Sequence, residues 1–234
     1  MPSFLIVFLA TGFTFLMTAA GSATVFFFKK EIPDSLQRIF LGFAAGVMIA
    51  ASVWSLLIPA ISQSQALGMI GWLPPSIGFA LGSLSLLVFQ RFLPAEDLSG
   101  NLLLFCAITL HNIPEGMAVG LAWPLALGIG IQNFPEGAAI SLPLRKSGLS
   151  RTKAFLLGSA TGLVEPLFGL LALLLVRQVT VLMPWLLSFA AGAMIYVVAE
   201  ELIPEAQAEK HSAAGTLGIL AGFLLMMILD VSFG

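Results

Sequence analysis

His111-Asn-Ile-Pro-Glu-Gly116 is followed 21 residues later by Gln132-Asn-Phe-Pro-Glu-Gly137. Both copies of this x-N-x-P-E-G pattern lie inside long apolar stretches, so each places a carboxylate among hydrocarbon side chains. An ionisable group near the centre of a bilayer costs about 2.5–3.5 kcal/mol on insertion scales and is rare without a function or a partner. Close packing of small residues does not explain a repeated glutamate. The pattern therefore predicts a polar site in the middle of a membrane protein.

The chain as a whole has the composition of a membrane protein. Apolar residues make up 59% and charged residues 9% of its 234 residues, and the mean hydropathy is +1.03, whereas soluble domains have about 45–50% and about 25%. Apolar stretches near or above the roughly 20 residues that cross a bilayer recur along the chain. They predict an all-α integral membrane protein, a single transmembrane domain over 1–234, with eight helices at about 4–28, 36–61, 69–90, 102–123, 124–144, 154–177, 181–203 and 214–232.

The basic residues predict how these helices are oriented, because short loops rich in Lys and Arg stay in the cytoplasm. With the N-terminus outside, Arg177 alone falls on the outer side, and both termini are expected outside. The first segment lacks a basic start, so we expect a retained helix and not a secretory signal. The net charge of −2 argues against a nucleic-acid partner. The basic residues assigned to the cytoplasmic side are Lys29, Lys30, Arg38, Arg91, Arg145, Lys146, Arg151, Lys153 and Lys210.

A second repeat joins the second and seventh predicted helices. Phe43-Ala-Ala-Gly-Val-Met48-Ile ends at Leu57-Ile-Pro59, and Phe189-Ala-Ala-Gly-Ala-Met194-Ile ends at Leu202-Ile-Pro204. The predicted topology makes these helices antiparallel, as in the inverted repeats of secondary transporters. Close helix packing also favours such small residues. Together with the paired motif, the repeat predicts three helices, a central pair and three inverted helices.

Three carboxylates, those of Glu115, Glu136 and Glu165, are predicted near mid-membrane with no Lys or Arg at the same depth. Three adjacent carboxylates repel one another and take up protons unless cations lie between them. This missing counter-charge indicates a path for positive ions. The single cysteine, Cys106, allows neither an intrachain disulfide nor a thiolate cluster.

Helical spacing adds amide and imidazole ligands to these carboxylates. His111 and Asn112 share a helix face with Glu115, and Gln132 and Asn133 share one with Glu136. Oxygen ligands with one imidazole suit divalent zinc, iron, manganese or cadmium. Prolines inside both motifs and directly after Glu165 free backbone carbonyls, which in lipid must be satisfied by protein, water or an ion.

Other interpretations remain open at this point. Singly, the histidine is explained by packing, a proline by a kink and a glutamate by a structural hydrogen bond. Beside divalent-metal transport, the glutamates suit a proton channel or a proton-coupled carrier of another substrate. An intramembrane metalloprotease would need H-E-x-x-H or an equivalent, but His111 is followed by Asn and no second intramembrane His is predicted. We therefore expect that the protein is not an enzyme and carries no prosthetic group.

The motifs HNIPEG and QNFPEG, with Gly162-Leu-Val-Glu-Pro166 on the next helix, resemble the ZIP family of metal transporters over the whole chain. The second motif begins with Gln and in this resembles the second motif of the prokaryotic branch of that family. The resemblance implies a binuclear centre between the fourth, fifth and sixth helices. It assigns one position to Met48, His111, Glu115, Gln132 and Glu136, and a second to Asn112, Asn133 and Glu165 with Glu115 and Glu136 bridging. Met48 is equally explained as a packing residue.

The resemblance also implies how such a protein works. The first, fourth, fifth and sixth helices slide as an elevator against the second, third, seventh and eighth, and a homodimer in a prokaryotic inner membrane carries metal into the cytoplasm. On this interpretation Glu200 and Glu201 line an exit route at the cytoplasmic helix end that also carries Glu205, and a solvated helix end explains the pair equally. A solvated helix end is the preferred interpretation for Glu209 and His211. Gln132 and Asn133 replace the His and Asp of some relatives, which leaves the metal preference open. The loop 91–100 lacks a histidine-rich tract, so metal capture there is not expected.

Overall fold

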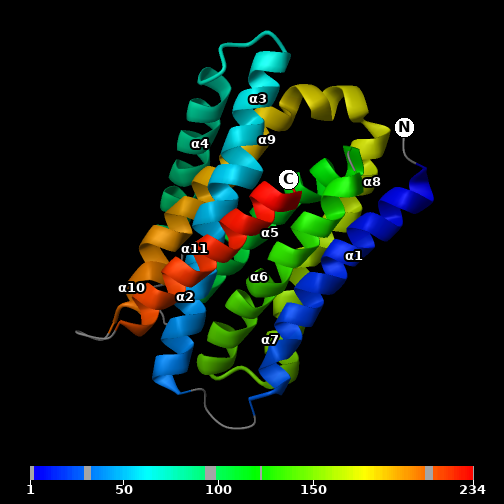
Figure 1. Cartoon of the computed structure of the whole chain (residues 1–234). Coiled ribbons are helices and arrows are strands. Elements are labelled where there is room, and N and C mark those ends of the chain that lie inside the picture. The colour runs from blue at the N-terminus through cyan, green and yellow to red at the C-terminus, as the bar shows by residue number, and fades with distance from the viewer. Residues whose placement is uncertain (1–2, 29–32, 93–98, 122, 209–212, 234) are drawn as a thin grey trace.

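The computed structural model describes residues 3–28, 33–92, 99–121, 123–208 and 213–233, and every regular element in these ranges is a helix (Figure 1). The predicted all-α class is therefore confirmed. In chain order the elements are α1 (Phe4–Ser22), η1 (Ala23–Phe26), α2 (Asp34–Ala51), η2 (Ser52–Leu57), α3 (Ile58–Ala66), α4 (Leu73–Gln90), α5 (Ser99–Leu121), η3 (Trp123–Leu125), α6 (Ala126–Lys146), α7 (Arg151–Ala160), η4 (Thr161–Leu163), α8 (Val164–Leu174), α9 (Val176–Val197), η5 (Val198–Leu202), α10 (Ile203–Ala206) and α11 (Ala214–Phe233).

The surface of the bundle is suited to lipid. Large apolar side chains such as Leu163 and Leu220 are more than half exposed. Within the described ranges, six helical spans are long and apolar enough to cross a membrane, namely Phe4–Phe26, Asp34–Ala66, Leu73–Gln90, Arg151–Leu174, Gln178–Ala206 and Ala214–Ser232. The other two of the eight predicted spans fall on α5 and α6, and the polar residues of the x-N-x-P-E-G pattern lower the mean hydropathy of α6.

Two helix ends differ most from the sequence-based expectation. The second helical span continues through the polar residues 62–65 to Ala66, beyond the predicted end at 61. It stops where Gly68 takes a φ of +73°, a left-handed conformation that glycine adopts without strain. The seventh span begins at Val176, immediately after α8, whereas the sixth helix was predicted to reach residue 177 and the seventh to begin at 181.

Glycines bring the helices together in four close pairs. A Cβ on Gly21 of α1 would lie 1.8 Å from the carbonyl oxygen of Phe134 in α6, and one on Gly120 of α5 would lie 2.3 Å from that of Gly169 in α8. The same holds for α4 and α9 at Gly82, and for α2 and α11 at Gly222. These are backbone-to-backbone contacts, which only small residues permit in membrane helices.

The close contacts divide the helices into two groups. Every described glycine whose added Cβ would meet a separate helix closer than 3 Å has that neighbour in its own group. The first group contains α1, α5, α6, α7 and α8, and the second contains α2, α3, α4, α9, α10 and α11. Among the described residues, close glycine contacts of this kind therefore occur within each group and not across the boundary between the groups.

The register of these contacts follows the second repeat. A Cβ on Gly82 of α4 would lie 1.9 Å from the carbonyl oxygen of Phe189, and one on Gly222 of α11 would lie 2.1 Å from that of Phe43. Phe43 and Phe189 occupy the same position in the two copies of the repeat. The α4–α9 pair and the α2–α11 pair therefore have the same packing, and the repeat includes α4 and α11.

Both copies of this repeat end in a π-helical segment, η2 and η5, directly before Ile58-Pro59 and Ile203-Pro204. Proline has no N–H to donate to the carbonyl four residues earlier. A wider turn at the same place in both copies accommodates that missing bond, and such turns are frequent at functional sites. The η2 and η5 segments carry Ser55 and Glu200 at equivalent positions, two residues before the shared Leu.

Candidate metal-binding site

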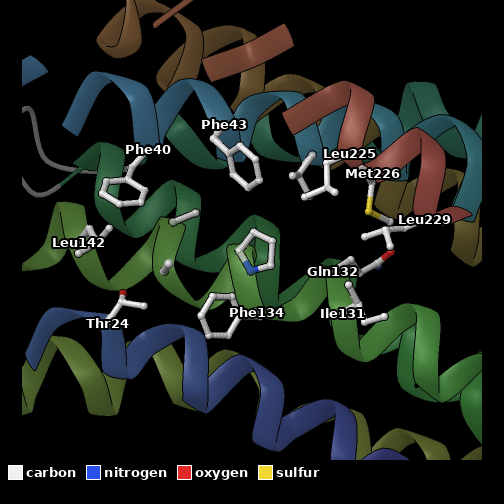
Figure 2. Close-up of a pocket in the computed structure, with 14 residues that line it drawn as sticks. Thr24, Phe40, Phe43, Ile131, Gln132, Phe134, Leu142, Leu225, Met226 and Leu229 are labelled. Atoms are coloured by element: carbon white, nitrogen blue, oxygen red, sulfur yellow. The ribbon is translucent and has the colours of Figure 1, made fainter. Parts of the chain in front are cut away.

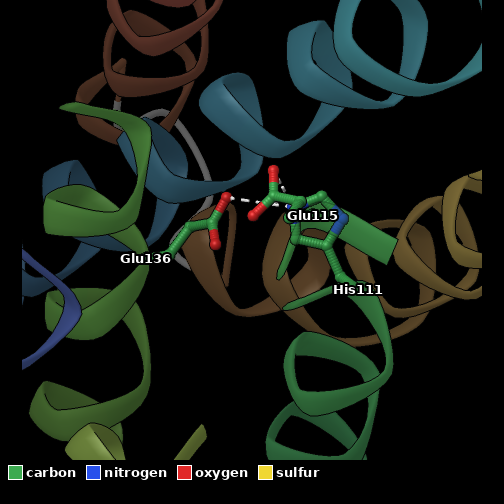
Figure 3. Close-up of side chains that lie close together, drawn as sticks. All are labelled: His111, Glu115 and Glu136. Atoms are coloured by element: carbon green, nitrogen blue, oxygen red, sulfur yellow. Dashed lines mark ion pairs between the residues drawn. The ribbon is translucent and has the colours of Figure 1, made fainter. Parts of the chain in front are cut away.

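The centre of the bundle holds three ligand side chains from α5 and α6 (Figure 3). His111 Nε2 lies 3.0 Å from Glu115 Oε1 and 3.5 Å from Glu136 Oε1. All three side chains are buried, at 0%, 2% and 1% exposure. One ligand atom from each lies within 4.8 Å of the others, which allows all three to contact one ion. The i, i+4 spacing on α5 and the facing motif on α6 produce this geometry.

Gln132 completes this group. Its Nε2 donates a hydrogen bond to Glu115 Oε1, and its Oε1 accepts one from Ser55 Oγ at 3.3 Å. Rotation of the terminal amide by half a turn exchanges its donor and acceptor, since the two ends have the same shape. The amide oxygen is therefore available to face a cation held by the carboxylates.

The electrostatics of the group favour a cation. Among the described residues, the ion pairs of Glu115 and Glu136 are with His111 alone. Two carboxylates and one imidazole in a buried space retain a negative charge that one histidine does not neutralise. Several of their atoms, including Glu115 Oε2 and both oxygens of Glu136, are buried without a hydrogen-bond partner among the described residues. A bound cation would satisfy such acceptors.

A second polar group lies beside the first, between α5, α6 and α8. Asn133 Nδ2 donates to Glu165 Oε1 at 2.9 Å, and Asn112 Nδ2 donates to the carbonyl oxygen of Thr161 at 3.0 Å. Thr18 Oγ1 also donates to Glu165 Oε1, at 3.4 Å. The free Oδ1 atoms of both asparagines and Oε2 of Glu165 are buried acceptors without a partner among the described residues.

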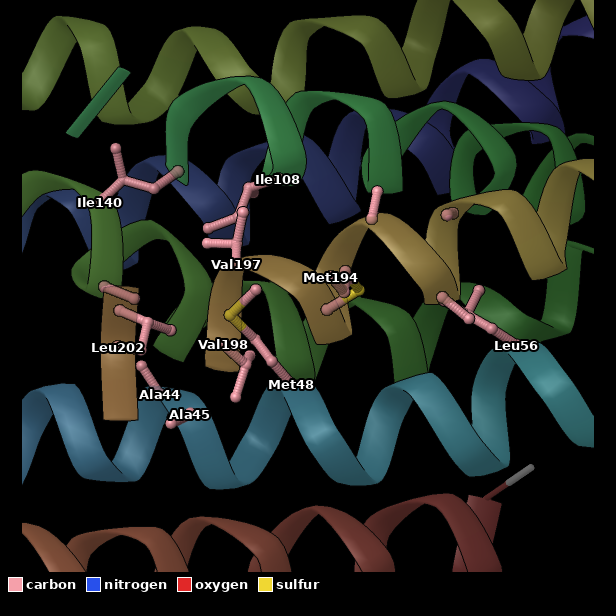
Figure 4. Close-up of a cluster of buried hydrophobic side chains, with 14 of the residues drawn as sticks. Ala44, Ala45, Met48, Leu56, Ile108, Ile140, Met194, Val197, Val198 and Leu202 are labelled. Atoms are coloured by element: carbon pink, nitrogen blue, oxygen red, sulfur yellow. The ribbon is translucent and has the colours of Figure 1, made fainter. Parts of the chain in front are cut away.

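Met48 lies in a buried apolar cluster (Figure 4). The cluster also contains Ile108, three residues before His111, and Ile140, four residues after Glu136. Its central residues come from α2, α5, α6, α9 and η5 and are buried. The apolar cluster therefore closes one side of the ligand group. Its members include Met48, Ile108, Ile140, Met194, Val197 and Leu202.

The opposite side of the ligand group is open. A cavity of about 370 Å³ is lined by Glu115 and Gln132 and extends past Ser55 and Gln63 to Asp230. Ser55 Oγ donates to Asp230 Oδ1 at 2.6 Å, so η2 and α11 are joined at the cavity wall. In this conformation, the cavity reaches the carboxylate of Glu115 and the amide of Gln132.

Sequence reasoning missed Asp230 and Ser55. The three predicted mid-membrane carboxylates are joined by a fourth, because Asp230 lies on α11 within electrostatic range of Glu136 and His111. The signal was present, since Asp230 falls inside the predicted segment 214–232 and is an acidic residue in an apolar stretch. Ser55 carried no comparable signal, because its orientation depends on the π-helical segment.

Glu200 and Glu201 do not join the buried ligand group. Glu200 is exposed on η5, where its Oε1 accepts a hydrogen bond from Gln90 Nε2 at 3.5 Å, and Glu201 is partly buried. Glu205 accepts a hydrogen bond from Gln37 Nε2 at 3.2 Å. The other two residues assigned to the solvated helix end, Glu209 and His211, lie outside the described residues.

Comparisons with known proteins agree with the motifs. A family model described as ZIP zinc transporter matches residues 91–230, which contain both motif copies and Glu165. Zinc transporter GufA of Myxococcus xanthus is 36% identical, over 88% of this chain and 90% of its own length. Zinc transporter ZIPB of Bordetella bronchiseptica is 36% identical, over 94% and 79% respectively. Zinc transporter ZIP11 of Xenopus tropicalis is 35% identical, over 97% and 96%.

Proposed function

This chain belongs to the ZIP family of zinc transporters, and from that premise we propose that it carries zinc into the cytoplasm through the buried group of His111, Glu115, Gln132 and Glu136. The observation that carries the proposal is the convergence of two carboxylates and an imidazole within 4.8 Å, buried and paired with no Lys or Arg among the described residues. Carboxylate, amide and imidazole ligands suit zinc and also cadmium, iron and manganese. No covalent step is required.

We propose a binuclear centre, with a second ion held by Asn112, Asn133 and Glu165. The unpartnered amide and carboxylate oxygens of these residues support this second position. Glu115 and Glu136 each keep an unpartnered oxygen as well, which suits them as bridges between the two ions. Met48 is the proposed fifth ligand of the first position, reached from its place in the apolar cluster.

The proposed topology has eight transmembrane helices in a 3+2+3 order with both termini outside. The positive-inside distribution supports it, because Lys146 and Arg151 then lie in the cytoplasm. The cavity beside Asp230 opens on the outer side in this topology, and the apolar cluster closes the cytoplasmic side. The described conformation is therefore ready to receive metal from outside, and Glu200 and Glu201 line the proposed exit route.

Movement of one helix group past the other would change this access. The glycine contacts within each group and their absence at the described boundary support two rigid bodies. The ligands are carried by α5, α6 and α8, which belong to one group, so an elevator motion of that group moves the whole centre. Following the family resemblance, we further propose a homodimer in a prokaryotic inner membrane.

Uptake by proteoliposomes tests the proposed function. The purified protein is expected to take up zinc from a mixture of zinc, cadmium, iron and manganese, with and without an imposed proton gradient. A Glu115→Gln, Glu136→Gln double variant should lose uptake, whereas Glu209→Gln, expected from the sequence in a solvated loop, should retain it. Proton flux without metal uptake in the wild type would favour the proton carrier. Metal uptake that persists in the double variant would remove the basis of the assignment.

A further inference from the structure

A second cavity, of about 320 Å³, lies between α6 on one side and α2 and α11 on the other (Figure 2). Its walls come from both helix groups, so it lies on the boundary that the proposed movement would cross. The lining is almost wholly apolar. Its principal residues are Phe40, Phe43, Phe134, Ala138, Leu225 and Met226.

The two polar side chains of the lining lie at opposite ends of the cavity. Gln132 lies at one end beside Leu229, and Thr24 lies at the other beside Leu142 (Figure 2). Gln132 is already bonded to Glu115 and Ser55. Thr24 Oγ1 is buried and has no hydrogen-bond partner among the described residues. The cavity therefore offers one free hydroxyl at the end away from the metal site.

Water does not suit this space. A dry apolar cavity of about 150 Å³ holds benzene, and this cavity is about twice as large. Phe134 and Leu225 line it and are 40% and 43% exposed, so it continues to the outer surface of the bundle. In a membrane, the medium at that surface consists of acyl chains.

We propose that this cavity binds one acyl chain of a membrane phospholipid. The Thr24 hydroxyl donates to the ester carbonyl of the lipid, and the hydrocarbon chain lies between Phe43 of α2 and Phe134 of α6 with its end near Gln132. This arrangement gives the unpartnered hydroxyl an acceptor and fills the apolar space with a molecule of matching chemistry.

The cavity marks an asymmetry between the two halves of the repeat. The motif copies make α5 and α6 equivalent, and the second repeat makes α9 and α2 equivalent. However, α5 packs extensively against α9, with Met183 and Leu187 buried, whereas α6 contacts α2 less. The acyl chain occupies the space left between α2 and α6. Insofar as the elevator motion applies, the lipid favours the described conformation, because closing that space would expel it.

Photolabelling of the wild-type protein tests the binding site directly. A phosphatidylglycerol with a diazirine near the end of one acyl chain is incorporated in the membrane, irradiated, and mapped by peptide mass spectrometry. Label is expected to be concentrated on residues 131–135 and 225–229, at the Gln132 end of the cavity. Label spread evenly over the lipid-facing helices would overturn the proposal.

Two variants and a matched control sharpen this test. Ala138→Phe fills the cavity and should reduce labelling there to background, whereas Ala80→Phe on the exposed face of α4 should leave it unchanged. Thr24→Val keeps the side-chain shape and should lower occupancy by about two- to tenfold, as expected for one hydrogen bond. Equal labelling in Thr24→Val and wild type would refute the ester contact. Because labelling does not require transport, its failure is distinguishable from failure of the proposed function.

Discussion

Replacement of Lys146 is predicted to destabilise the described conformation relative to one in which the two helix groups have moved. Lys146 Nζ, at the end of α6, lies 3.9 Å from Asp34 Oδ1 of α2 and 3.8 Å from Glu205 Oε1 of α10. Both ion pairs therefore join the two helix groups. The three side chains are 51%, 75% and 46% exposed, and such surface pairs contribute about 0.2–1 kcal/mol each. Lys146→Ala should therefore shift the balance between conformations by about 1 kcal/mol, or roughly fivefold.

The measurement is the reaction rate of a cysteine introduced at a position that is buried in this conformation. Ile108 has no exposed surface in the apolar cluster, and its equivalent in the second motif copy, Ile129, lines the open cavity. Movement to the opposite conformation should expose it, so the reaction rate of Ile108→Cys with a thiol reagent reports the minor population. Measured in a Cys106→Ser background, that rate should rise about fivefold when Lys146→Ala is added.

Two controls decide whether the ion pairs are responsible. Lys153→Ala removes a charge from α7 within the first helix group and should leave the rate unchanged. About 1 M salt shortens the Debye length to about 3 Å, so it should raise the rate in the parent protein and have little effect on Lys146→Ala. An unchanged rate in Lys146→Ala, or an equal rise in Lys153→Ala, would contradict the stabilisation of this conformation by the ion pairs of Lys146.

Three further predictions follow from the cavity, the second ligand group and the close helix pairs. Asp230→Asn should raise the KM for zinc uptake about tenfold at low salt with little change in kcat, because its charge concentrates cations in the cavity, and Ser55→Ala should have a smaller effect in the same uptake assay. Glu165→Gln should remove one of two bound zinc ions in equilibrium dialysis and leave the other. Gly82→Ala and Gly222→Ala should each lower thermal stability by about 1–3 kcal/mol through overpacking, and unequal losses in thermal melts would contradict the matched register.

The ligand group was predictable because it depends on local spacing. The i, i+4 spacing of His111 and Glu115 places the two side chains on one helix face, whatever surrounds α5. The matching motif on α6 needed only an antiparallel neighbour to bring Glu136 into contact. The helical spans were predictable for a related reason, since in lipid the backbone must satisfy its own hydrogen bonds over a length set by the bilayer.

The access route was not predictable in the same way. The π-helical segment that turns Ser55 toward Gln132 arises from how the helix accommodates Pro59, and the same proline also suits an ordinary kink. Asp230 could be recognised as acidic, but its place on the cavity wall depends on the packing of α11 against α2. The division into two groups was expected only from the family resemblance, because composition does not reveal which helix each glycine contacts.

The matched register would give the two access states of the proposed transport cycle equivalent backbone packing. Gly82 and Gly222 are equivalent, so eight residues further on Gln90 is equivalent to Asp230. The hydrogen bond from Gln90 to Glu200 therefore corresponds to the one between Ser55 and Asp230. In the proposed movement, exchanging the roles of the repeats would convert the cavity beside Asp230 into one beside Gln90 with equivalent backbone packing. The two states then differ in energy mainly through side chains that break the symmetry, and a small difference of this kind is what a transporter needs to populate both.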